Sequence, residues 1–81
     1  MAQAEVIGKL LMKEIKANMT GTVISVLVKT GEAVTSGQDV LSIESMKMEM
    51  VISSDFSGTV KEIKVNAEDF IQEGQVLITL E

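Results

Sequence analysis

The hydrophobic positions of this 81-residue chain form a pattern that occurs twice, at an offset of 37 positions. When residues 17–44 are aligned with residues 54–81, seven of the 28 pairs are identical and most of the others keep their character. The identical pairs are Gly21/Gly58, Thr22/Thr59, Val23/Val60, Val28/Val65, Gly37/Gly74, Gln38/Gln75 and Glu44/Glu81. Two units are too few for a solenoid, so the sequence predicts two similar halves that close on one core.

Both halves have the pattern of β-strands. In the second half Ile63 and Val65 alternate with charged residues, which is the period of two expected when one face of a strand is buried. Val60 falls out of that phase by one residue, and Val23 does the same in the first half. The repeated slip predicts a bulge or a sharp twist at the same place in both halves.

Glycines mark the boundaries of the expected strands. Gly21 and Gly58 open the first strand of each half, where we expect either a glycine conformation or a close approach of two backbones. Gly37 and Gly74 each interrupt the chain before the last strand of a half, which is typical of a turn.

One repeat position does not match. Gly31 has the sequence context of a turn residue with positive φ, but its partner in the second half is Glu68. A glutamate in that conformation costs about 1 kcal/mol or more. The second turn is therefore either built differently, for example on Asn66, or strained.

Residues 45–53, SMKMEMVIS, join the two halves. Strand alternation predicts that Met46, Met48 and Met50 share one side while Lys47 and Glu49 share the other. We expect a hairpin corner here, which would present a lysine to other proteins.

Composition restricts the chemistry that is available. The chain has no His, Cys, Trp or Tyr, and its formal net charge is −5. The lack of cysteine excludes disulfides and thiolate metal sites, and the negative charge argues against a nucleic-acid partner. Apolar runs are too short to span a bilayer. A hydrophobic content of 46% indicates one packed domain, which we expect in the cytoplasm.

Lys47 provides the amine that is the main candidate for covalent chemistry in this chain. An isolated lysine beside methionines is usually a solvated surface residue. A free lysine amine is protonated at neutral pH, and neighbouring Glu44 and Glu49 favour the charged form. Lys47 is therefore not expected to act as a Schiff-base catalyst. We interpret it instead as a substrate that another enzyme acylates.

The segment ESMKME at residues 44–49, placed between the repeated Gly-Thr-Val segments, resembles the biotinyl domain of the biotin carboxyl carrier protein family, which is related to lipoyl domains. The resemblance covers about residues 13–81. It implies an all-β fold, a flattened β-barrel (barrel-sandwich hybrid) of two four-stranded antiparallel sheets with pseudo-twofold symmetry. Lys47 would lie on a tight hairpin at one end, opposite the chain ends.

The resemblance also implies a function. A biotin protein ligase would attach biotin to Lys47, giving N6-biotinyllysine. The arm would then shuttle carboxyl from a biotin carboxylase to a carboxyltransferase of an acyl-CoA or related carboxylase, with the domain itself non-catalytic. Met46, Met48, Glu44 and Glu49 would contribute to ligase recognition. Core packing of the two methionines and simple solvation of the two glutamates are the alternatives.

Several features depart from the family pattern. Ser45 replaces a common alanine, the chain has no proline, and the short segment between Val28 and Gly31 leaves no room for a thumb insertion. Residues 1–12 match nothing in the family, so we expect an N-terminal extension or linker before a domain at residues 13–81. The alternatives are a lipoyl carrier, with lipoate as the covalent cofactor, and an unmodified barrel that acts as a docking module. Lipoyl lysines typically follow an aspartate, which favours biotin here.

Overall fold

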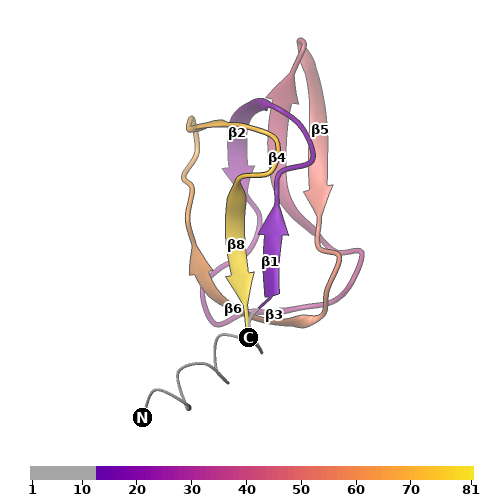
Figure 1. Ribbon diagram of the computed structural model, residues 1–81, viewed down its shortest axis with the longest axis vertical. Coiled ribbons are helices and arrows are strands. Elements are labelled where there is room, and N and C mark those ends of the chain that lie inside the picture. Colours follow the sequence, from indigo (N-terminus) through magenta and orange to yellow (C-terminus); the bar gives the residue numbers. More distant parts are fainter. Residues whose placement is uncertain (1–12) are drawn as a thin grey trace.

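The computed structural model describes residues 13–81, which form eight β-strands joined by turns (Figure 1). The strands are β1 (Lys13–Lys16), β2 (Gly21–Val26), β3 (Ala33–Val34), β4 (Asp39–Ser45), β5 (Met48–Ser53), β6 (Gly58–Ile63), β7 (Phe70–Ile71) and β8 (Val76–Leu80). Within this range there is no helix long and apolar enough to cross a membrane. The extension expected over residues 1–12 lies outside the described residues.

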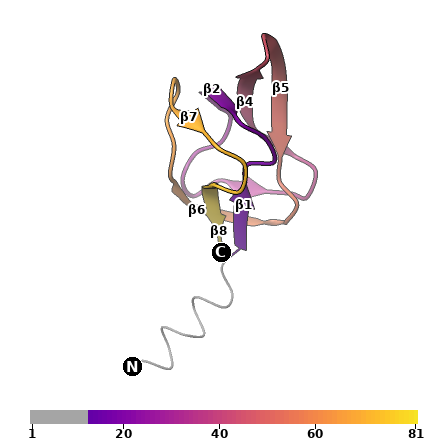
Figure 2. The ribbon, with the colours of Figure 1, turned by 45° about the horizontal axis from the view of Figure 1, so that its top comes forward.

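The strands form two antiparallel four-stranded sheets, with the orders β1-β8-β6-β3 and β5-β4-β2-β7. In Figure 2 the labelled strands of the second sheet gather in the upper part of the barrel, and β1, β6 and β8 lie below them. The offset of 37 positions converts β1 to β5, β2 to β6, β3 to β7 and β4 to β8. It therefore converts one sheet order into the other, which confirms the predicted fold and its pseudo-twofold symmetry.

Both predicted irregularities are present. The pairing of β2 with β4 shifts register between Val23 and Ser25, and the pairing of β6 with β8 shifts between Val60 and Glu62. These positions differ by the repeat offset. The bulges turn Val23 and Val60 into the core, where each is only 1% exposed, although they break the alternation of their strands.

The core lies between the two sheets and is almost entirely aliphatic. Its buried hydrophobic residues are Ile15, Ala17, Val23, Val28, Val34, Val40, Leu41, Ile43, Ile52, Val60, Val65, Ile71, Leu77, Ile78 and Leu80. Thr79 is buried among them, and its Oγ1 atom has no hydrogen-bond partner in residues 13–81.

Close backbone contact explains the two strand-opening glycines. A Cβ atom on Gly21 would lie 2.6 Å from the carbonyl oxygen of Glu44, and one on Gly58 would lie 2.7 Å from that of Glu81. Neither distance is possible for a real side chain. Of the two explanations offered by the sequence, the close approach is confirmed.

The mismatched turn is built in the same way in both halves. The amide of Gly31 donates to Val60 O at 2.8 Å, and the amide of Glu68 donates to Val23 O at 2.7 Å. Gly31 has a φ of 90° and Glu68 has a φ of 77°. Glu68 thus adopts the left-handed conformation with a full side chain, which makes the strained alternative the correct one.

Candidate functional site

Lys47 lies at the tip of the hairpin formed by β4 and β5. The two strands pair from Asp39 with Ser53 to Ser45 with Met48, which leaves Met46 and Lys47 as a two-residue turn. Their φ angles are 53° and 64°. Positive φ at both central residues defines a type I′ turn, whose twist suits antiparallel strands.

This turn is strained because neither central residue is a glycine or an asparagine. A side chain in the left-handed region costs roughly 1–2 kcal/mol, so Met46 and Lys47 together store strain that the strand pairing must hold. Backbone strain of this kind concentrates at functional sites. Here the strained turn conformation fixes the direction in which the Lys47 side chain projects from the hairpin.

The hairpin extends to the end of the barrel opposite the C-terminus (Figure 1). Lys13 pairs with Leu80, so the start and the end of the described chain lie together, away from the hairpin. Lys47 is exposed, and its amine forms no ion pair with residues 13–81.

The methionines beside Lys47 are not part of the core. Met46 is 91% exposed and Met48 is 60% exposed, whereas Met50 is half-buried and packs against the core. The core-packing alternative is therefore wrong for Met46 and Met48. The predicted division of faces is also wrong for Met46 and Lys47, because they are turn residues to which strand alternation does not apply.

Glu44 and Glu49 lie directly opposite each other on β4 and β5. Both are exposed, and Glu49 Oε1 accepts a hydrogen bond of 3.2 Å from Ser42 Oγ. Like charges at opposed positions are destabilising, so fold stability does not explain the pair. The ion pairs among the described residues lie instead on the strands of the other sheet or directly beside them: Glu14–Lys16, Lys61–Glu81 and Glu62–Lys64. Glu44 and Glu49 thus form an acidic patch on the hairpin that takes part in no ion pair within residues 13–81.

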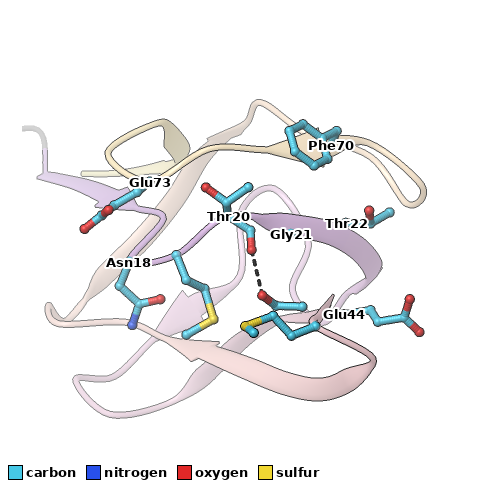
Figure 3. Close-up of a pocket in the computed structure, with 10 residues that line it drawn as sticks. Asn18, Thr20, Gly21, Thr22, Glu44, Phe70 and Glu73 are labelled. Atoms are coloured by element: carbon cyan, nitrogen blue, oxygen red, sulfur yellow. Dashed lines mark hydrogen bonds between the residues drawn. The ribbon is translucent and has the colours of Figure 1, made fainter.

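A hollow of about 630 Å³ lies beside the tip of the hairpin, between it and the loop before β2 (Figure 3). It is lined by residues 18–22, residues 44–46, Phe70 and Glu73. Ser45 Oγ donates a hydrogen bond of 2.8 Å to Thr20 O, drawn as a dashed line in Figure 3, and so ties the hairpin to the loop before β2. Sequence reasoning missed this hollow because no single periodicity links its segments.

The described residues present one lysine amine at the tip of the hairpin. Within residues 13–81 no cluster of His, Cys, Asp or Glu has the composition of a metal site. The fold and the site define a class of small domain: a barrel of two related sheets that presents one lysine on a strained hairpin turn.

Comparison with known proteins identifies the family. A family model described as "Biotin-requiring enzyme" matches residues 13–80. The chain is 46% identical over 66 residues to the biotin/lipoyl attachment protein of Bacillus subtilis, a match that covers 82% of this chain and 90% of that protein. The chain belongs to the biotinyl/lipoyl-attachment domain family.

Larger proteins contain similar segments. The chain is 40% identical over 67 residues to the mitochondrial propionyl-CoA carboxylase alpha chain of Homo sapiens, covering 83% of this chain and 9% of that one. The urea carboxylase of Kluyveromyces lactis matches in structure with a TM-score of 0.80 and 27% identity, over 86% of this chain and 6% of the carboxylase. The chain thus spans most of a small attachment protein but little of these carboxylases.

Proposed function

We propose that Lys47 is the attachment site of biotin and that the chain is the non-catalytic carrier of a biotin-dependent carboxylase. A biotin protein ligase joins the biotin carboxyl group to Lys47 Nζ as an amide. The attached biotin supplies a ring nitrogen that carries carboxyl from a biotin carboxylase to a carboxyltransferase acting on an acyl-CoA or a related acceptor. The observation that carries this proposal is the exposed Lys47 at the tip of a type I′ hairpin.

The hairpin suits a carrier because it combines a rigid mount with a long tether. β4 and β5 are paired along their length, so the lysine backbone is held while its side chain is free. A flexible tether makes each delivery effectively intramolecular, with a local concentration on the order of millimolar. The chain's own contribution is therefore to hold, orient and present the arm.

Four neighbours of Lys47 form the surface that a ligase would meet. Met46 and Met48 offer unbranched, exposed thioethers, which adapt readily to an apolar pocket on a partner. Glu44 and Glu49 add an acidic patch that attracts a basic partner surface, an effect on association rate more than on affinity.

Lipoate is the second candidate for the acid attached to Lys47. The name of the Bacillus subtilis relative includes both biotin and lipoyl, which supports this candidate. A lipoyl group would use the same lysine and the same turn. An unmodified docking module is the remaining reading, in which Lys47 stays a free amine.

Intact-mass measurement separates these readings. The purified chain is incubated with a biotin protein ligase, biotin and ATP, and in parallel with a lipoate ligase and lipoate. We expect one biotin adduct in the native chain, none in Lys47→Arg, and one in Lys29→Arg, a matched change at another exposed lysine. An adduct with lipoate alone supports the second candidate, and no adduct with either acid contradicts both carrier readings.

A further inference from the structure

We propose that the hollow beside the tip of the hairpin is a resting site for the head group of the biotin carried on Lys47 of the same chain. The attached arm folds back against the domain between visits to its partners. This inference rests on the proposed function. Attachment of biotin to Lys47 does not itself require the hollow, and we assign the hollow the biotin head group as its ligand.

The arm is long enough to reach the hollow. The route descends two residues from Lys47 to Ser45, crosses the hydrogen bond from Ser45 Oγ to Thr20 O, and continues two residues to Asn18. At about 3.4 Å per extended residue, the four residue steps alone account for roughly 14 Å, and the hydrogen-bond crossing adds several ångströms, so this path along the chain is an upper bound on the straight-line distance. The near side of the hollow begins beside the turn, because Ser45 and Met46 line it. A biotinyl-lysine arm has about eleven bonds between Cα and the ring, each advancing about 1.25 Å, which places the ring up to about 14 Å away.

The apolar part of the hollow suits the sulfur-containing ring and the aliphatic chain of biotin. Met19 lines the hollow, is half-buried and packs against the core, so it provides an apolar wall. Met46 also lines the hollow, is 91% exposed and directly precedes Lys47. Because its side chain is unbranched and flexible, it can close over the arm from above.

The polar part of the hollow suits the ureido group. Asn18 and Glu73 lie on the same side of it in Figure 3, held there by hydrogen bonds of 2.8 Å from Gly74 N to Ala17 O and from Ala17 N to Gln75 O. The ureido group offers N–H donors and one carbonyl acceptor. The Glu73 carboxylate accepts from such a donor, and the Asn18 amide donates to such a carbonyl. A hydrogen bond to an ionised carboxylate is stronger than one between neutral groups.

The opposite end of the barrel provides an internal comparison. The positions equivalent to Asn18 and Glu73 are Asp55 and Ser36. There, Ser36 Oγ donates to Asp55 O at 3.3 Å, which ties the two segments together. Within residues 13–81, the side chains of Asn18 and Glu73 form no hydrogen bond. At the hairpin end the same pair of positions is thus available to a ligand.

Only weak affinity is needed. The tether sets a local head-group concentration on the order of 1 mM, so a dissociation constant of about 1 mM fills the site half of the time. Such a weak contact also releases the arm readily when a partner's own site competes for it.

Amide NMR of the 15N-labelled chain tests the proposal. Spectra are compared between the unmodified chain and the chain whose single biotin adduct is verified by mass. We expect shifts at residues 18–22 and 73–74 in addition to those around the hairpin. Lys47→Gln, which removes the charge without adding an arm, should shift only signals near residues 44–49.

Side-chain variants then assign the contacts. Removing one ureido hydrogen bond weakens the contact about fivefold, so occupancy falls from a half to about a sixth. Glu73→Ala and Asn18→Ala should each reduce the biotin-dependent shifts about threefold, whereas Glu62→Ala, the same change on the opposite sheet, should leave them unaltered. Both Asn18 and Glu73 are exposed, so folding is not at risk.

The result that overturns the resting site leaves the carrier function intact. If the adduct forms and residues 18–22 move no more than in Lys47→Gln, the arm does not rest in the hollow and attachment still stands. If no adduct forms, the proposed function fails and the resting site fails with it.

Discussion

Replacing Glu68 with glycine should stabilise the domain, although the change removes a side chain. Glu68 has a φ of 77° in a turn whose counterpart places Gly31 at 90°. The two turns share the same backbone hydrogen bonds, and a Cβ atom on Gly31 would contact nothing within 4 Å. The difference between the two turns is therefore the conformational cost of a side chain in the left-handed region.

That cost can be estimated. Relief of left-handed strain raises the free energy of unfolding by roughly 1–2 kcal/mol. The greater conformational freedom of glycine in the unfolded chain lowers it by roughly 0.5–1 kcal/mol. We expect Glu68→Gly to raise the free energy of unfolding by about 0.7 kcal/mol. For a domain of this size, that corresponds to a rise in Tm of roughly 3–6 °C.

Urea denaturation followed by far-ultraviolet circular dichroism measures the effect, since the chain contains no Trp or Tyr for fluorescence. Glu68→Ala should leave stability within about 0.5 kcal/mol, because alanine keeps the strain. Glu73→Gly is the matched control: φ is not positive at this position, so the change should destabilise by about 0.5–1 kcal/mol. Equal stability changes in Glu68→Gly and Glu73→Gly would refute the explanation based on strain.

Three further changes test other parts of the structure. Thr79→Val should raise the free energy of unfolding by about 1 kcal/mol, because it removes the buried unpaired hydroxyl; a loss of stability in urea would show that the hydroxyl is satisfied. Gly21→Ala should lower it by about 1–3 kcal/mol, since the new Cβ meets Glu44 O at 2.6 Å; an unchanged urea midpoint would contradict that close approach. Ser45→Ala should cost about 1 kcal/mol by breaking the bond to Thr20 O and speed amide exchange at the hairpin; unchanged exchange would show that the bond does not hold the hairpin tip.

The repeat was sufficient to predict two similar halves around one core, whereas the barrel of two four-stranded sheets was predicted from the family resemblance. The out-of-phase Val23 and Val60 predicted bulges that the structure confirms at both positions. The close backbone approach at Gly21 and Gly58 was also among the explanations that the sequence offered. The choice between a rebuilt and a strained turn at Glu68 needed coordinates, since a residue type alone does not reveal whether the surrounding structure enforces a costly φ.

The site was less predictable. Sequence placed Lys47 at the joint between the halves, and the structure places it on the hairpin turn. The orientation of Met46 could not follow from alternation, because a two-residue turn interrupts the strand period. The hollow is lined by Asn18 and Glu73, which are far apart in the sequence and lie near each other because Ala17 hydrogen-bonds to Gly74 and Gln75.

The pairing of Lys13 with Leu80 occupies the same symmetry position as the pairing of Met50 with Ile43 in the hairpin. The barrel therefore has two equivalent corners, one closed by the lysine turn and one left open. The described chain enters the fold at Lys13 and reaches Leu80 at the open corner, at the other end of the barrel from Lys47. A circular permutant would join the two chain ends at this corner through a second Met-Lys turn and place its new termini in another loop. Such a domain would present two lysines, one at each end of the barrel.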